Sequence, residues 1–226
     1  RHPWWHDNRV SEEQTPADNR SRVTTDEMRE FIKEDWAPRA ISQVEPAPVA
    51  PFAAQRRARL SAAFPGDRLI IPAGGLKVRS NDCDYTFRPH TAFAYLTGLG
   101  ADREPDALLV LEPTFDQAGE PTGHESVLWF APLAPRDSDD FFSDARYGEF
   151  WVGARPTLAE IETELGLTAR DIADLGDALV KDAGTITVRM VRDAEQSLTA
   201  RLDGERVANG AAEENLQEAD GALAHE

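Results

Sequence analysis

Cysteine and long apolar runs are both scarce in this sequence. Cys83 is the single cysteine, so no disulfide can form within the chain, which agrees with a reducing compartment. No apolar run approaches the roughly 20 residues that are needed to cross a bilayer. Residues 1–20 also lack the apolar centre of a secretory signal. These absences predict a cytoplasmic location.

Positive charge is in deficit as well. The chain has 24 Lys and Arg residues against 41 Asp and Glu residues, which gives a formal net charge of -17. A charge of this sign repels phosphate backbones and anionic lipid headgroups, so the sequence predicts no nucleic-acid partner and no membrane partner. With 226 residues, 41% of them hydrophobic, the chain is long enough for one domain with appendages or for two small domains.

The residues that metal sites need are dispersed. His124 is followed by Glu125, but the second histidine of a zinc-binding helix is missing. The acidic run 137–144 lacks the glycine and the closing glutamate of an EF-hand loop, and it is typical of a solvated loop. The five histidines lie far apart: His2, His6, His90, His124 and His225. The sequence therefore predicts no metal ligands in this chain.

Motifs for nucleophilic catalysis and for phosphate binding are missing too. Cys83 lies between Asp82 and Asp84, whose carboxylates oppose the thiolate that a reactive cysteine requires. The sequence has no Gly-x-Ser-x-Gly elbow and no phosphate-binding Gly-Lys-Ser/Thr, and Gly98 and Gly100 supply only part of a dinucleotide fingerprint. The residues alone predict a folded domain without catalytic residues.

Residues 1–50 have the composition of an N-terminal extension and linker. Thr24 and Glu27 are spaced as a capping box, and they predict a helix that runs to about Trp36. The proline-rich run 44–51 then predicts an extended linker, with a domain boundary at its end.

Three tryptophans belong to this extension: Trp4, Trp5 and Trp36. Exposed indoles are unfavourable without a partner surface. We therefore expect these side chains to attach the extension to the main body.

Helix and strand patterns alternate after the linker. Apolar spacing predicts helices at 52–64 and 157–166, and a third at 168–184 that Thr168 would cap and Gly184 would end. Short apolar or β-branched runs predict the strands, at 68–71, 91–99, 106–113, 125–132 and 185–192. The pattern predicts an α/β domain at 51–192, with a sheet of about five strands flanked by helices. A polar, partly helical tail follows at 193–226.

The segment Ser80–Gly100, SNDCDYTFRPHTAFAYLTGLG, concentrates charged and aromatic residues. Asp82 and Arg88 could form a structural ion pair within it. Its aromatic residues alternate as the faces of a strand do, which predicts that four of them pack in the core: Tyr85, Phe87, Phe93 and Tyr95. Tyr95 is predicted to be embedded in a strand, out of reach of a ligand.

The same segment carries a resemblance to a known family. Residues 79–99, RSNDCDYTFRPHTAFAYLTGL, resemble the signature of the N-terminal domain of Xaa-Pro aminopeptidases (aminopeptidase P, in the creatinase/prolidase superfamily). The likeness continues through DALLVLEP, SVLWFAPLAPRD and EFWVGAR, and it is strongest over 56–155. Thr86, Ala94 and Ala154 depart from the family pattern, but none of them removes a charged group from the segment.

The resemblance implies a ribonuclease H-like α/β fold, in which a mixed sheet of about five strands carries helices on both faces. A helical N-terminal arm precedes it here. In the family, a second domain follows that holds two metal ions, usually manganese, and this domain is absent from the chain. The complete enzyme removes the N-terminal residue from peptides with proline in second position. The N-terminal domain serves homo-oligomerisation and shapes the active-site entrance, so no catalytic residues are implied in this chain.

Two residues acquire a role from the resemblance. The tryptophan that matches Trp151 is presented to the neighbouring subunit's active site, where a flat indole suits a proline ring. The aspartate that matches Asp82 lies near the same entrance, so both are implied to be substrate-binding. From its pattern alone, Trp151 could instead be a core residue. An alternative function is a free-standing oligomerisation or interaction domain without peptidase activity.

Overall fold

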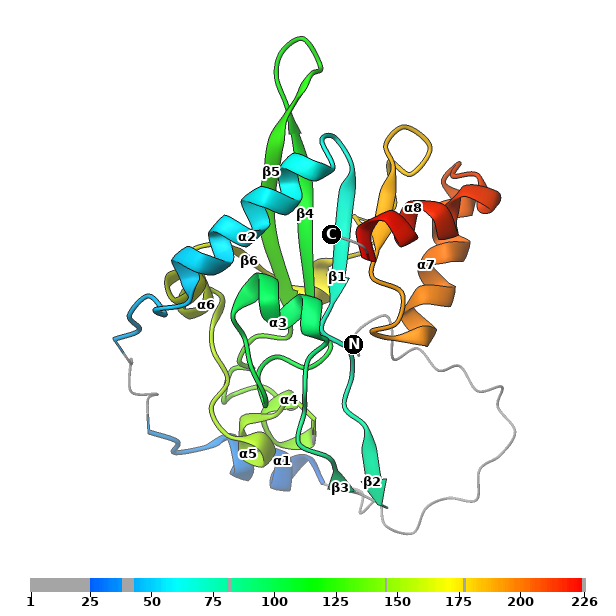
Figure 1. Cartoon of the computed structure of the whole chain (residues 1–226). Helices are drawn as coiled ribbons and strands as arrows, with labels where there is room; N and C mark the ends of the chain where they lie inside the picture. The colour runs from blue at the N-terminus through cyan, green and yellow to red at the C-terminus, as the bar shows by residue number, and fades with distance from the viewer. Residues whose placement is uncertain (1–24, 38–42, 81–82, 145, 177, 225–226) are drawn as a thin grey trace, which may run out of the picture. The chain divides into compact units, whose positions relative to one another are not determined.

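The chain folds into two compact units. Unit 1 combines Arg1–Gln43 with Pro132–Thr157, and unit 2 combines Val44–Ala131 with Leu158–Glu226. The computed structural model describes residues 25–37, 43–80, 83–144, 146–176 and 178–224 (Figure 1). Each unit is therefore assembled from stretches that are distant in the sequence.

Unit 2 is built on a mixed sheet with the strand order β6-β5-β4-β1-β7. The pairs β1–β4 and β4–β5 are antiparallel, whereas β1–β7 and β5–β6 are parallel. The five strands are β1 (Arg68–Pro72), β4 (Leu108–Phe115), β5 (Pro121–Phe130), β6 (Thr168–Asp171) and β7 (Val188–Met190). The predicted α/β fold with a mixed sheet of five strands is confirmed.

The central strands of this sheet are apolar on both faces. All five residues of β1, RLIIP, are buried, and so are the first four residues of β4. A continuous apolar run of this kind is typical of a strand that is covered on both sides. The register places Leu69 opposite Leu111 and Ile71 opposite Leu109.

Helices provide the cover for the sheet. In Figure 1, α2 (Ala50–Ala63) and α3 (Thr91–Thr97) lie across one face of it. Leu60 of α2 and Phe93 of α3 join the core that the alternate residues of β1 and β4 also form. The remaining helices of unit 2 are α6 (Leu158–Leu165), η2 (Ile172–Asp174), α7 (Gln196–Ala208), η3 (Glu213–Asn215) and α8 (Leu216–Ala224). No helix in the described ranges combines the length and the apolar character that a membrane span requires.

Unit 1 contains short helices, among them α1 (Asp26–Lys33), α4 (Asp140–Ser143) and α5 (Glu149–Val152). The side chain of Thr25 caps α1 by accepting a hydrogen bond from the backbone N–H of Met28. The predicted cap, Thr24, lies outside the described residues, and α1 ends at Lys33, before Trp36. The helix was therefore predicted correctly, but with the wrong cap and an end that is too late.

The strand predicted at 91–99 is wrong, because this segment forms α3. His90 caps the first turn through Nδ1, and Gly98 ends the helix with a φ of 84°. The buried residues Phe93 and Leu96 are three positions apart, which is a helical interval. The alternation of the aromatic residues indicated a strand, although the buried residues have the spacing of a helix.

The helix predicted at 168–184 is also wrong. Its first residues form strand β6, in which Thr168 pairs with Val127 of β5 and Asp171 with Phe130. Asp171 then caps the short helix η2, and turns follow. Parallel pairing with β5 is a contact between segments distant in the sequence, so local periodicity does not report it.

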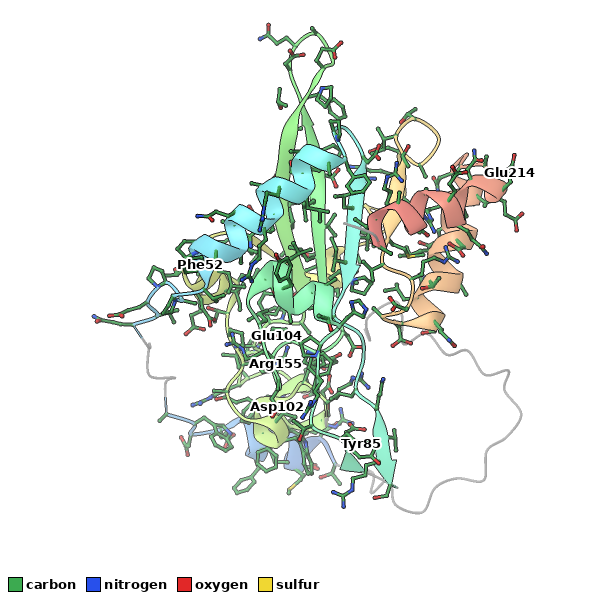
Figure 2. All side chains as sticks on the ribbon, viewed as in Figure 1. Phe52, Tyr85, Asp102, Glu104, Arg155 and Glu214 are labelled. Carbon is green, nitrogen blue, oxygen red and sulfur yellow. The ribbon has the colours of Figure 1, made fainter. Side chains whose placement is uncertain are left out.

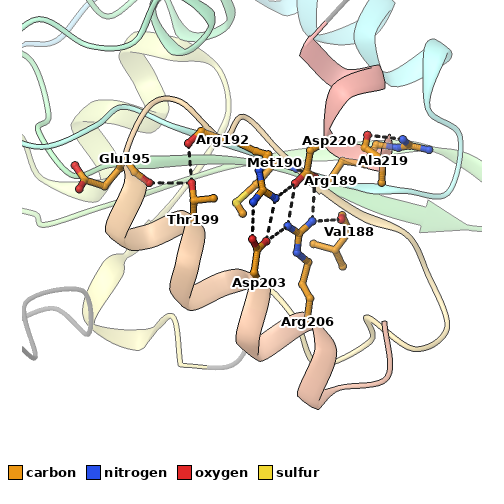
Figure 3. A network of polar contacts seen from close by, with 10 residues as sticks. All are labelled: Val188, Arg189, Met190, Arg192, Glu195, Thr199, Asp203, Arg206, Ala219 and Asp220. Carbon is orange, nitrogen blue, oxygen red and sulfur yellow. Dashed lines mark hydrogen bonds and ion pairs between the residues drawn. The ribbon is translucent and has the colours of Figure 1, made fainter. Parts of the chain in front are cut away.

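A network of charged side chains, of which Arg206 and Asp220 are buried, joins the C-terminal helices to the edge of the sheet (Figure 3). Asp220 of α8 accepts hydrogen bonds from Arg192 and from Arg206 of α7. Asp203 of α7 accepts from the same two arginines. Arg206 also donates to the carbonyl of Val188 in β7. Because an unpaired buried charge is costly, the buried Asp220 carboxylate and the buried Arg206 guanidinium must come together when these helices fold.

Replacing Asp220 by alanine is expected to destabilise the chain by about 3 kcal/mol, because the buried Arg206 guanidinium loses one of its two carboxylate partners. Urea unfolding followed by circular dichroism measures the loss. Asp174→Ala changes an exposed aspartate and serves as the control, with an expected effect below about 0.5 kcal/mol. Equal effects of the two substitutions would contradict the structural role of the network.

The same network predicts a pH dependence through Asp203. Burial opposes its ionisation, but the hydrogen bonds from Arg192 and Arg206 outweigh burial and lower its pKa below the ordinary value of 3.8. Such a carboxyl adds stability above its unfolded pKa, and this contribution is lost as the pH falls through the folded pKa. The difference in stability between the wild type and Asp203→Asn should therefore be largest near neutral pH and shrink below about pH 4. Thermal unfolding at several pH values tests this, and a difference that does not change with pH would refute it.

Candidate functional site

Trp151 lies in unit 1, on the short helix α5. Its side chain is 60% exposed, and its Nε1 donates a hydrogen bond to the carbonyl of Phe142, 2.6 Å away. One edge of the indole is therefore held by the backbone while much of the ring stays accessible. This exposure is that of a surface residue and not of a core residue.

The direction in which Trp151 points depends on a glycine. A Cβ at Gly148 would lie 2.5 to 2.7 Å from the carbonyl oxygens of Asp140, Phe141 and Asp144. No side chain fits at these distances, so α4 and α5 can pack this closely only with glycine between them. The tight connection fixes the start of α5 and with it the position of Trp151.

Aromatic rings pack edge to face around this helix. The ring centroid of Trp36 lies 5.0 Å from that of Phe141 and 6.4 Å from that of Phe150. The Phe150 ring in turn lies 5.5 Å from the Trp151 ring. Phe141 is 2% exposed, whereas the other three rings are about half exposed. The four rings form a cluster with a buried centre and an accessible outer side, which we call the aromatic cluster.

Trp36 thus links the N-terminal extension to the segment that carries Trp151, in agreement with the predicted attachment. The other two tryptophans of that prediction, Trp4 and Trp5, lie outside the described residues. Both partners of Trp36 in the aromatic cluster belong to the Pro132–Thr157 stretch of unit 1.

Arg136 forms polar contacts beside the aromatic cluster. Its Nε and Nη2 donate to the two carboxylate oxygens of Glu149, at 3.1 and 2.8 Å, and its Nη1 donates to the carbonyl of Ala37. Hydrogen bonding with Glu149 raises the pKa of Arg136 above its ordinary value. A hollow of about 450 Å³ opens beside this pair, and Trp36 forms part of its wall.

The second predicted site residue, Asp82, lies outside the described residues. The strands on either side of it, β2 (Val78–Ser80) and β3 (Cys83–Asp84), pair as an antiparallel ribbon in unit 2. Tyr85, which follows the ribbon, is exposed (Figure 2). The role of Asp82 and its ion pair with Arg88 therefore stay predictions.

The packing prediction for the four aromatic residues is half correct. Phe87 and Phe93 are buried, but Tyr85 and Tyr95 are 60% and 50% exposed. Tyr95 lies on α3 two positions after the buried Phe93, and this interval turns it to another side of a helix. The guanidinium of Arg56 lies 4.3 Å from the centroid of its ring and donates to its backbone carbonyl.

A hollow of about 280 Å³ in unit 2 was missed from the sequence. It opens between α2, α3, β1 and α8, and its polar edge is formed by Arg56, Arg59 and Tyr95. Apolar residues form the remaining wall: Leu60, Ile71, Ala92, Leu96, Val191 and Leu223. Such a site can hold an apolar group beside a negative charge. The signal that could have revealed it is the run of arginines on α2, in a chain that is otherwise acidic.

Ser61 and His124 have the geometry of a nucleophile and its base, but a structural role. The serine Oγ lies 2.7 Å from Nδ1 of the imidazole, and Nε2 lies 2.6 Å from the carbonyl of Asp67. Because a carbonyl can only accept, Nε2 is the donor to Asp67, and in the neutral imidazole Nδ1 then accepts from the serine. Both ring nitrogens therefore serve to join α2, β5 and the turn before β1.

The described residues do not fit a metal pair. Within the ranges that the structure covers, no group of three or more His, Cys, Asp or Glu side chains could hold a metal ion. His90 lies 3.2 Å from Asp193 and His124 is engaged as above. The two manganese ions that the resemblance implies would therefore need ligands other than these described residues.

Comparisons with known proteins agree with one another. The family described as "Aminopeptidase P, N-terminal domain" matches residues 53–188. Xaa-Pro aminopeptidase 1 of Streptomyces coelicolor is 40% identical over 184 residues, and Xaa-Pro aminopeptidase 2 of the same organism is 39% identical over 176 residues. The alignments cover 80% and 78% of this chain, but 35% of either relative. The chain thus spans about a third of the length of these curated relatives.

Solved structures show the same fold. The aminopeptidase PepP of Pseudomonas aeruginosa superposes with a TM-score of 0.52 and 25% identity, over 69% of this chain and 31% of that chain. Aminopeptidase P from E. coli gives a TM-score of 0.51 and 24% identity, over 67% of this chain and 31% of that chain. At 24% identity, the similarity to the E. coli protein supports the fold and nothing further.

Exposure of Trp151 predicts that its removal has a small effect on folding. Trp151→Ala is expected to lower the free energy of unfolding by less than about 1.5 kcal/mol, because little buried surface is lost. The control, Trp129→Ala, removes a buried indole of β5 and should cost about 3 to 5 kcal/mol. Chemical unfolding compares the two, and a loss of several kcal/mol for Trp151→Ala would identify it as a core residue.

Proposed function

The chain belongs to the aminopeptidase P N-terminal domain family, and on this premise we propose that it is the non-catalytic N-terminal domain of a metal-dependent Xaa-Pro aminopeptidase. The observation that carries the proposal is the relation of lengths. The relatives named Xaa-Pro aminopeptidase align with 80% of this chain, yet the chain covers 35% of them. The complete protein would remove the N-terminal residue from peptides with proline in second position.

The role of this domain would be to shape the entrance to an active site that other polypeptide supplies. Trp151 supports this role, because its indole is anchored at one edge and accessible elsewhere. A flat aromatic surface of this kind can pack against the ring of a substrate proline. Asp82 would lie at the same entrance. The two metal ions, which we expect to be manganese, would be held by the catalytic domain.

Assembly is the second part of the proposal. Large apolar side chains of unit 1 are exposed in the described residues, and such surfaces mark contacts with other molecules. They include Met28, Phe31, Phe150, Trp151 and Val152. We expect the contact to be with a second copy of the protein, in the cytoplasm. The same surface is what a free-standing oligomerisation domain would need, which makes that domain the alternative function.

Peptide hydrolysis tests the proposal. The purified chain with added manganese is expected to show no turnover of an Ala-Pro peptide, because the described residues hold no metal-binding group. A longer product of the same gene, with the residues that follow Glu226, should be active. In that longer protein Trp151→Ala should raise KM about tenfold with little change in kcat, as expected when binding alone is lost.

The control in this experiment is Phe52→Ala, which removes an exposed aromatic ring of α2 in unit 2. Turnover by the chain alone would overturn the assignment. A gene that stops at Glu226 would favour the free-standing oligomerisation domain, and an unchanged KM for Trp151→Ala would remove Trp151 from the entrance.

A further inference from the structure

The N-terminal extension packs against the segment that carries Trp151, and this packing suggests a function for it. We propose that Trp36 is a positioning residue: it holds the Pro132–Thr157 segment of unit 1 in the conformation that presents the Trp151 indole. The consequence for substrate binding rests on the proposed function above. The structural part, that Trp36 holds this segment in its conformation, does not depend on the proposed function.

The aromatic contacts form a relay from the extension to Trp151. Trp36 packs edge to face on the buried ring of Phe141 and on Phe150, and Phe150 packs edge to face on Trp151. The Trp36 indole is itself fixed, because its Nε1 donates to the carbonyl of Ile32 at the end of α1. The position of Trp36 is therefore set by α1, and the ring of Phe150 connects Trp36 to Trp151.

A second connection runs through polar groups. Arg136 donates to the carbonyl of Ala37, next to Trp36, and forms a two-point ion pair with Glu149. Glu149 is the first residue of α5, the helix that carries Trp151. One guanidinium thus joins the backbone of the extension to the start of that helix.

Ion pairs hold α1 itself against the same segment. Arg29 lies 3.0 Å and Lys33 3.4 Å from the carboxylate of Asp139, which precedes α4. The Lys33 side chain also pairs with Glu30 of its own helix. Isolated surface ion pairs contribute little to stability. These contacts therefore orient α1, and the aromatic rings make the main contribution to the stability of its packing.

The Trp151 segment is poorly suited to hold its own shape. Helices α4 and α5 have four residues each, far below the length at which a helix is stable by itself. Their shared core is Phe141, and Trp36 provides part of its cover. Without Trp36, the phenyl ring would face water on that side, and the turn at Gly148 would lose the packing that keeps Trp151 in place.

Hydrogen exchange tests the structural part on the 226-residue chain. Trp36→Ala should speed exchange of the backbone amides of residues 138–153 about tenfold, because two aromatic contacts to this segment are lost. Amides of β1 and β4 in unit 2 should exchange at the wild-type rate. Trp36→Phe keeps a ring on Phe141 and should restore much of the protection. Phe52→Ala is the control, since it removes an aromatic side chain of α2 in unit 2 that is 59% exposed, and it should leave exchange in residues 138–153 unchanged.

Two results would overturn the proposal. Unchanged exchange in residues 138–153 would show that Trp36 does not hold the segment. Equal acceleration in β1 and β4 would show that Trp36 supports the whole chain and not this site.

Kinetics of the longer, active protein test the functional part. Trp36→Ala should raise KM for an Ala-Pro peptide about as much as Trp151→Ala does, and the double variant should be no worse than Trp151→Ala alone. Additive effects would refute a role that acts through Trp151. If Trp151→Ala leaves KM unchanged while hydrogen exchange responds to Trp36→Ala, the proposed entrance function fails and the positioning role stands.

Discussion

Burial of strand β1 on both faces is the constraint from which the fold of unit 2 follows. A strand with the sequence RLIIP cannot sit at a wetted surface, so it needs neighbours on both edges and helices above and below. β4 and β7 supply the edges, one antiparallel and one parallel, which makes the sheet mixed. Helices α2 and α3 close one face, with Phe93 as a fully buried contact. Arg68, also in this strand, is buried with its charge because Glu112 and Asp182 reach it.

Much of this architecture could be predicted from the sequence, and the failures have a physical cause. The strands at 68–71 and 125–132 and the helix at 52–64 were found because their apolar pattern is local and matches one period. The segment 91–97 satisfies a strand period in its aromatic residues and a helix period in its buried residues, and tertiary packing decides for the helix. At 168–171, pairing with β5 outweighs a helical propensity that is visible locally.

The candidate site was less predictable than the fold. Trp151 was found by resemblance to a family, since the pattern EFWVGAR does not distinguish a core indole from a surface one. The dependence of its position on Gly148 comes from carbonyl oxygens of α4, which no sequence period reports. The pairing of Trp36 with Phe141 joins parts of the chain that the sequence keeps far apart. Contacts of this kind require the folded backbone before they can be recognised.

The two-part construction of unit 1 has a consequence for how the protein matures on the ribosome. The hydrogen bonds that close this unit join residues up to 110 positions apart, as Arg29 and Asp139 are. At synthesis rates of about 5–20 residues per second, the extension would wait about 5 to 20 seconds for its partner stretch to be made. During that interval Phe141 has not yet been synthesised, so the indole of Trp36 lacks this packing partner. Until the Pro132–Thr157 stretch emerges, the nascent chain exposes an apolar surface to which chaperones can bind.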